Sequence, residues 1–351
     1  MHIPYEKIIR IILVITFVGG MCIIFILLRP RWPGLFNPSP FIDQQVTSHP
    51  QVDTASSTVA PWVDNGVIAF VLGDRNGDNH IYTMNIDGSG VTDLANCLKG
   101  ECYPSWSPDG TKIVFQRQED GVGIYVMNAD GSHIQRLSPI PGYDFRPSWS
   151  PDGSQIIFNR VTNPPILPSQ VPNVAIMVMS SNGANTRTIL EANGTYNLEP
   201  QWSPDGSKIV FMSGLDGTQQ IYTMNPDGTN VTKITNKGVS GDPVWSPDGS
   251  RISFGSNREG GDNLNIFTMN PDGTDVKQVT HFLPPYEAGD TSWSPDGTRI
   301  IFEWDVGGKH QSDPHVRAEI WIVNINGTGE TSTGQPCSAV GCSPRWQPVK
   351  K

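Results

Sequence analysis

The sequence WSPDGTKIVF, residues 106–115, decides the fold because its pattern recurs along the chain. The spacings between successive copies lie between 43 and 53 residues, and repeats of about 40–50 residues are typical of propeller blades. Copies of WSPDG begin at five tryptophans and a degenerate copy, WQP, begins at a sixth: Trp106, Trp149, Trp202, Trp245, Trp293 and Trp346.

Three further strand-like segments complete each repeat. After the first WSPDG they are KIVF from residue 112, IYVMN from 124 and IQRLS from 134. These segments are short, rich in β-branched and aromatic residues, and bounded by Gly, Pro and Asp, as strands commonly are. Within SPDG, proline presets φ for a tight turn and glycine supplies a positive φ. We therefore interpret WSPDG as a structural hairpin with a tryptophan that packs between blades, and not as a catalytic motif.

The first repeat unit lacks a good copy of the opening strand. Residues 66–95 supply three strands, but only PWVDN, residues 61–65, precedes them, and SPRWQP, residues 343–348, is left over. The simplest solution pairs the strand around Trp346 with the first unit, which leaves no exposed sheet edge. In the alternative, Pro61-Trp62 fills this place and the C-terminus packs outside.

The expected fold is therefore all-β: a six-bladed β-propeller of four-stranded antiparallel blades over residues 62–348, preceded by one transmembrane helix. Together, the WSPDG, KIVF, IYVMN-ADG and RLS segments resemble the TolB-like, WD40-like repeat called PD40. This resemblance implies a propeller of the kind that binds other proteins. We expect a membrane anchor where TolB has a separate α/β domain, so TolB's own partners are not carried over. The sequence contains no G-x-S-x-G elbow of the related propeller hydrolases.

The strand order places the WSPDG and N-x-D-G turns on one face of the propeller and the variable loops on the other. Variable loops on a rigid scaffold are the usual place for binding. Just before four of the inner strands stand Arg146, Glu199, Asp242 and Asp290, which we expect to ring the mouth of the central channel. Three carboxylates and one arginine there would bind a cation or a basic ligand. The alternative is that they are solvated loop residues.

Two loops carry side chains compatible with a metal. The insert 303–319 contains Asp305, His310, Asp313 and His315, although their spacing matches no defined metal motif and a polar loop is the alternative. Residues 74–78, DRNGD, begin like a calcium loop but lack its final glutamate. No cofactor is expected, and calcium or another divalent metal would bind at these loops if anywhere.

The cysteines form two C-x4-C pairs, Cys97 with Cys102 and Cys337 with Cys342. Each pair ends four residues before a repeat tryptophan, so the pairs occupy equivalent loops on either side of the first blade. Two local disulfides are expected, and disulfides indicate an oxidising compartment. The alternative is a four-cysteine zinc site, for which this spacing is unusual.

The N-terminal region predicts a membrane anchor. Residues 11–28 contain no charge, and as a helix they would extend about 27 Å, close to the thickness of a bilayer core. Residues 1–10 are then a short cytoplasmic N-terminus, and residues 29–61, rich in Pro, Ser and Thr, a linker. Lipidation at Cys22 is an alternative, disfavoured by the apolar run after it. Because basic residues flank both ends almost equally, only the cysteines place the propeller on the extracytoplasmic side.

Composition narrows the partners. Residues 36–351 contain 20 of the 24 basic and 33 of the 34 acidic residues, a formal charge of −13. Such a domain repels phosphate backbones, so no nucleic acid partner is expected. The leading hypothesis is a membrane-anchored, non-catalytic scaffold that binds a protein, peptide or glycan with its variable face. The alternative is a carbohydrate-active or other hydrolytic or lyase enzyme with its site at the channel mouth.

Overall fold

The computed structural model forms two compact units, Met1–Pro61 with Ile166–Ser169, and Trp62–Pro165 with Gln170–Lys351. In the first unit it describes only the backbone of two strands, β1 (Ile12–Val18) and β2 (Met21–Leu27). In the second unit it describes residues 66–348 except 75–77, 99, 141, 164–171, 192–193, 262, 306–317 and 338–340.

The N-terminal segment 11–28 is not a helix where it is described. Strand β1 pairs with β2 in antiparallel register, with Ile12 opposite Leu27. Isoleucine, valine and phenylalanine dominate both strands, and these residues favour strands as readily as membrane helices. No helix of the described residues is long and apolar enough to cross a membrane. The predicted transmembrane helix is thus not confirmed, and the predicted N-terminus 1–10 and linker 29–61 lie outside the described residues.

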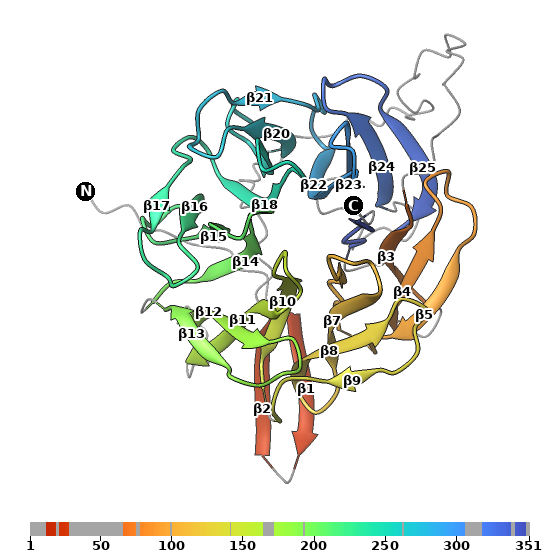
Figure 1. The fold of residues 1–351 in the computed structure, drawn as a ribbon, viewed down its shortest axis with the longest axis vertical. Helices are drawn as coiled ribbons and strands as arrows, with labels where there is room; N and C mark the ends of the chain where they lie inside the picture. The colour runs from red at the N-terminus through yellow and green to blue at the C-terminus, as the bar shows by residue number, and fades with distance from the viewer. Residues whose placement is uncertain are drawn as a thin grey trace, which may run out of the picture. The chain divides into compact units, whose positions relative to one another are not determined.

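The second unit consists of six four-stranded antiparallel sheets arranged around an axis (Figure 1), which confirms the predicted propeller. Blade 1 contains β26 (Arg345–Trp346), β3 (Ile68–Gly73), β4 (Asn79–Met84) and β5 (Thr92–Asn96); blade 2 contains β6 (Ser105–Trp106), β7 (Lys112–Gln118), β8 (Val122–Asn128) and β9 (Gln135–Arg136); blade 3 contains β10 (Asp144–Trp149), β11 (Gln155–Asn163), β12 (Asn173–Ser180) and β13 (Arg187–Leu190).

The same order of strands is repeated in the remaining blades. Blade 4 contains β14 (Asn197–Trp202), β15 (Ile209–Ser213), β16 (Gln220–Met224) and β17 (Thr232–Lys233); blade 5 contains β18 (Ser240–Trp245), β19 (Ile252–Ser256), β20 (Asn265–Met269) and β21 (Lys277–Gln278); blade 6 contains β22 (Glu287–Trp293), β23 (Arg299–Asp305), β24 (Glu319–Asn324) and β25 (Thr331–Pro336).

The C-terminal strand closes the ring in blade 1, as predicted. Trp346 of β26 lies opposite Ile68 of β3, and the Gln347 amide donates a hydrogen bond of 2.8 Å to the Val67 carbonyl. The innermost place of blade 1 is therefore taken by β26. The alternative, with Pro61-Trp62 in this place, is wrong.

Burial explains why each repeat carries the same apolar residues. The second strand of every blade contributes a phenylalanine with no exposed surface: Phe70, Phe115, Phe158, Phe211, Phe254 and Phe302. The repeat tryptophans lie between neighbouring blades. The indole of Trp293 donates to the carbonyl of Val244 in blade 5 at 3.1 Å, and that of Trp106 donates to Arg345 in blade 1 at 3.2 Å. The tryptophan is thus an inter-blade residue, as expected.

The turn residues are also structural. In the first SPDG turn, Asp109 Oδ1 accepts hydrogen bonds from the Ser107 hydroxyl at 2.6 Å and from the Thr111 amide at 3.0 Å. In the N-x-D-G turn of blade 5, Gly273 has a φ of +84°, and a Cβ there would lie 2.2 Å from the Ile234 carbonyl oxygen of blade 4. Glycine is required at this position both for the turn and for the close packing of neighbouring blades.

Candidate functional site

Four of the inner strands, β10, β14, β18 and β22, carry the same irregularity, which includes the residue three positions before the tryptophan. In β10, for example, Phe145 pairs with Asn159 and Ser148 with Ile157, so β10 has one residue more than its partner strand between these pairs. The equivalent residue of every blade has a φ between 41° and 57°. A β-bulge of this kind redirects one side chain per strand. The six residues, which we call the axial ring, are Tyr103, Arg146, Glu199, Asp242, Asp290 and Ser343.

The four predicted site residues belong to this ring, but their predicted position was wrong. Arg146, Glu199, Asp242 and Asp290 lie within β10, β14, β18 and β22, which begin two or three residues before them. The bulge lets each strand continue through a residue with positive φ. The residues are therefore part of the inner wall and not of the loops at its mouth.

Arg146 connects four blades. Its Nη1 forms an ion pair with Glu199 Oε1 and lies 3.7 Å from Asp242 Oδ1. Its Nη2 donates a hydrogen bond of 2.8 Å to the Tyr103 hydroxyl, and the guanidinium carbon lies 4.2 Å from the centre of the Tyr103 ring. The arginine side chain is 15% exposed and that of Glu199 only 9%. These contacts join blades 2, 3, 4 and 5 through side chains alone.

The bulges also explain why Glu199 is held in place. A bulge leaves a backbone amide outside the ladder, and the second strand of the preceding blade supplies an acceptor. Gln116 Oε1 accepts from the Arg146 amide at 2.8 Å, and Asn159 Oδ1 accepts from the Glu199 amide at 3.1 Å. Blade 4 has Met212 at the equivalent position, and Glu199 Oε2 instead accepts from the Asp242 amide at 2.8 Å.

The axial ring contains more carboxylates than positively charged groups, and this changes the pKa values of its members. Burial, together with the negative charge of Glu199, raises the pKa of Asp242 to about 7. Burial lowers the pKa of Arg146, but the carboxylates of Glu199, Asp242 and Asp290 together raise it above its usual value. The ring thus contains one arginine and three carboxylates, and Arg345 of β26 adds a second positive charge near Asp242.

Comparison with known proteins agrees with the fold and the repeat. Residues 95–172 match the family described as the TolB beta propeller domain. The structure is similar to that of TolB from Acinetobacter baumannii, with 21% identity, a TM-score of 0.66, and coverage of 81% of this chain and 67% of that one. The chain contains a TolB-like β-propeller domain. The resemblance seen in the repeats is thereby confirmed.

Other solved structures share the fold of this TolB-like propeller. A putative TolB from Agrobacterium tumefaciens is 19% identical, with a TM-score of 0.59 and coverage of 81% of this chain and 99% of that one. An oligogalacturonate lyase in complex with manganese is 17% identical, with a TM-score of 0.51 and coverage of 75% and 77%. At these identities the likeness concerns the fold alone. No curated protein matches the sequence.

Sequence reasoning missed three residues of the site in the TolB-like propeller. Tyr103 and Ser343 complete the ring, and the positive charge of Arg345 in β26 lowers the pKa of Asp242 against the stronger effects of burial and Glu199. A signal for two of them was present, since Tyr103 and Ser343 stand three residues before Trp106 and Trp346, as the other four stand before their tryptophans.

The cysteine pairs form the two predicted disulfides. The Cα atoms of Cys97 and Cys102 lie 5.7 Å apart and those of Cys337 and Cys342 4.6 Å apart, within the usual range for a disulfide. The zinc alternative is therefore wrong. Glu303 lies beside Cys337 and Cys342, but two sulfurs bonded to each other offer no thiolate to a metal.

The other metal candidates are only partly described. Asp305 ends β23 and lies opposite Glu287 of β22. His310, Asp313 and His315 lie outside the described residues, as does the middle of the calcium-like loop. At the ends of that loop, the Asp78 amide donates to Asp74 Oδ1 at 2.8 Å, as in an ordinary hairpin connection.

Proposed function

We propose that the chain is a membrane-anchored binding scaffold whose TolB-like propeller lies on the extracytoplasmic side and recognises a basic group of a protein or peptide. TolB-like propellers commonly act in protein binding. The observation that carries the proposal is the axial ring, where three carboxylates converge on a single arginine. A lysine, arginine or N-terminal amine of a partner would supply the charge that the ring lacks.

The contacts of Arg146 define how such a group would bind. Because Arg146 pairs with Glu199 and lies near Asp242, it is an internal competitor of the incoming cation. An incoming basic group would share these carboxylates and that of Asp290. The proton that Asp242 holds near neutral pH would be displaced, so affinity should rise as the pH rises through about 7. Affinity should also fall with salt, because the interaction is between charges.

The test is affinity capture with the full-length protein in detergent, comparing the wild type with the triple variant E199Q/D242N/D290N. The matched control, D87N/D130N/D227N, removes the same number of charges from the turns of the opposite face. Asparagine is tolerated there, since the equivalent turns of blades 3 and 6 contain Asn182 and Asn326. We expect the ring variant to lose the captured partner and the turn variant to retain it. The reverse result would mean that the partner binds the turn face.

A second candidate function is a carbohydrate-active enzyme, with a glycan as the ligand. The feature in its favour is the carboxyl of Asp242, whose pKa burial and the neighbouring Glu199 raise to about 7, as suits a general acid. Incubation with acidic and neutral oligosaccharides distinguishes the two functions. Release of new sugar ends by the wild type and not by D242N would establish the enzyme; no release supports the scaffold.

A further inference from the structure

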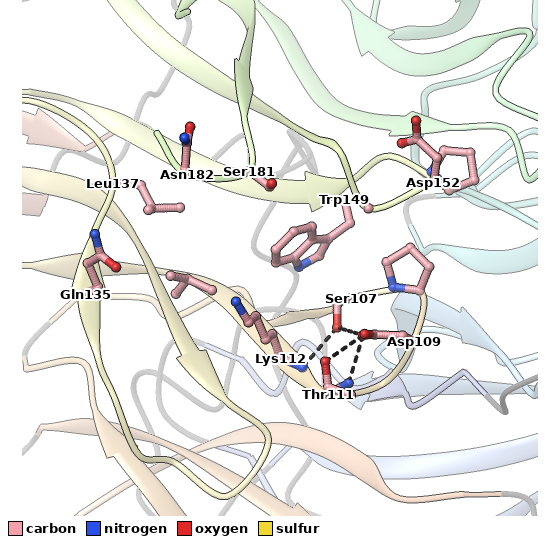
Figure 2. A pocket seen from close by; sticks show the side chains of 14 residues that line it. Ser107, Asp109, Thr111, Lys112, Gln135, Leu137, Trp149, Asp152, Ser181 and Asn182 are labelled. Atoms are coloured by element: carbon pink, nitrogen blue, oxygen red, sulfur yellow. Dashed lines mark hydrogen bonds between the residues drawn. The ribbon is translucent and has the colours of Figure 1, made fainter. Parts of the chain in front are cut away.

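A groove of about 410 Å³ lies between blades 2 and 3 on the face of the SPDG turns, away from the variable loops. This volume is within the range of small-ligand sites. Figure 2 shows Trp149 at its centre, with Lys112 and Asp109 of blade 2 below it and Asn182 and Asp152 of blade 3 above it; Gln135 and Leu137 lie at the left. The groove was not expected from the sequence, which indicated only structural turns on this face.

The repeats themselves show what distinguishes this groove. In blade 4, Lys208 occupies the position of Lys112, and its Nζ donates to Asn225 Oδ1 of its own turn at 2.8 Å. In blade 2 the counterpart of Asn225 is Asn128. The side-chain nitrogens of both asparagines bond their own turns, at Thr229 Oγ1 and Ser132 Oγ, but in the described part of the chain Asn128 Oδ1 accepts no hydrogen bond from Lys112. Among the described residues, the Lys112 ammonium has no hydrogen-bond or ion-pair partner, so it is available to a ligand.

The wall opposite Lys112, formed by blade 3, lacks a negative charge that the equivalent turns of blades 4 and 5 carry. The turn of blade 3 is SSNG, with Ser181 and Asn182, where the turns of blades 4 and 5 have proline and aspartate. Asn182 Oδ1 accepts from the Ala184 amide at 3.1 Å, which leaves the amide nitrogen of its side chain as a donor. Blade 6 also has an asparagine in this turn, but there the facing Arg251 is paired with Asp275 at 2.7 Å.

Two carboxylates also line the groove, those of Asp109 and Asp152, and each accepts hydrogen bonds within its own hairpin. Among the other polar side chains of the groove, those of Lys112, Gln135 and Asn182 offer hydrogen-bond donors. The carboxylate of Asp152 is turned into its own hairpin, where both oxygens accept from the Ser154 hydroxyl, at 2.9 and 2.8 Å. Beside the donors, Leu137 and Trp149 supply an apolar surface. An ammonium and two primary amides next to apolar side chains suit a carboxylate that carries a compact apolar group.

We propose that this groove binds a small carboxylate of about the size of an acylated amino acid, either a free acid or the C-terminus of a peptide, through Lys112, Gln135 and Asn182. The site is independent of the axial ring, which lies within the inner strands. A groove that binds no carboxylate would therefore leave the proposed function of the axial ring unaffected.

The test is calorimetric titration of the full-length protein with N-acetyl-leucine, with N-acetyl-leucinamide as the probe that lacks the charge. We expect saturable binding of the acid and at least tenfold weaker binding of the amide, because charge-assisted hydrogen bonds are lost. K112Q should weaken binding of the acid about tenfold and N182D by at least as much, whereas the matched variant K208Q should leave it unchanged. Lys112 and Asn182 are exposed and Lys208 is half-buried, and thermal unfolding checks that each variant is folded.

A pentapeptide that ends in leucine distinguishes the two sources of the carboxylate. Tighter binding than N-acetyl-leucine indicates a peptide terminus, and equal binding indicates a free acid. The proposal is overturned if no saturable binding of the acid is seen, if acid and amide bind equally, or if K112Q and K208Q have the same effect.

Discussion

At the scale of single residues, Arg146 organises the axial ring. Its guanidinium is the described positive charge closest to Glu199 and Asp242, and it also rests on the Tyr103 ring. Removing one partner of a largely buried ion pair leaves the other charge unpaired, which is more costly than the pair itself is stabilising. The same residue therefore stabilises the fold and limits access of other cations.

The variant R146Q should separate these two roles. We expect it to lower the free energy of unfolding by about 2–3 kcal/mol, because Glu199 loses its partner. It should also bind the captured basic partner more tightly, because the internal competitor is gone. Denaturant unfolding and titration with the partner measure the two effects, with the exposed Arg187→Gln as the control. Equal stability of R146Q and wild type would show that the ion pair contributes nothing.

The raised pKa of Asp242 predicts a pH-dependent stability. Between about pH 4 and pH 7 the folded protein keeps a proton on Asp242 that the unfolded chain has released, so stability falls as the pH rises through this window. D242N removes the dependence. At pH 8 it should unfold at a higher temperature than the wild type, and the difference should vanish near pH 4. Parallel thermal scans of the exposed control E259Q should show no such trend; a constant difference for D242N would contradict the shift.

The sequence predicted four ring residues because they are charged and stand at a fixed distance before the tryptophans. Tyr103 and Ser343 occupy the same position but are neutral, so nothing in their chemistry set them apart. The bulge could not be predicted either. A positive φ is commonly indicated by glycine or asparagine, and here arginine, glutamate and aspartate adopt it because the ladder on both sides holds them.

At the scale of elements, closure of the propeller depends on β26, a strand of two residues. Trp346 is 6% exposed and packs with residues of blades 1 and 6, and its backbone amide donates a hydrogen bond of 3.1 Å to the Ser292 hydroxyl oxygen. The C-terminal strand thus holds the first and last blades together. The repeat spacing and the leftover WQP were sufficient to predict this closure.

Truncation tests the closure. We expect W346A to lower the free energy of unfolding by about 3–4 kcal/mol, as for other buried tryptophans. Deletion of residues 343–351 should abolish a single cooperative unfolding transition, because it opens the ring. Deletion of Lys350 and Lys351 alone is the control and should change neither. A cooperative transition at the wild-type temperature without residues 343–351 would show that the ring is not closed by this strand.

At the scale of the whole molecule, the disulfides bear on the compartment. Both pairs lie in the loops that enter β6 and β26, on either side of blade 1, and each should stabilise the fold by about 2 kcal/mol. The N-terminal segment forms two strands and not a helix. The membrane anchor is therefore a proposal that rests on the uncharged residues 11–28. An apolar run alone does not distinguish a helix from strands, which is why this part of the fold was not predictable with the certainty of the repeats.

Cell fractionation tests the anchor and the compartment together. We expect the full-length protein to remain with membranes after an alkaline wash and a variant without residues 1–28 to be released, because only the former has an apolar anchor. Peptide mapping without reductant should recover Cys97 bonded to Cys102 and Cys337 bonded to Cys342. Free thiols at all four positions in natively localised protein would contradict the extracytoplasmic placement.

The hydrogen bond between Gln347 and Val67 brings the two ends of the propeller into one blade. The six blades therefore form a closed circle in which no blade is the first. The chain termini could lie between other strands without changing how the strands pair. A circular permutant in which a short linker joins residue 348 to residue 66, and the chain opens between β13 and β14, would keep every strand pair described above. In such a permutant the N-terminal linker would precede blade 4 and no longer blade 1. The blade that follows the linker could therefore be chosen freely.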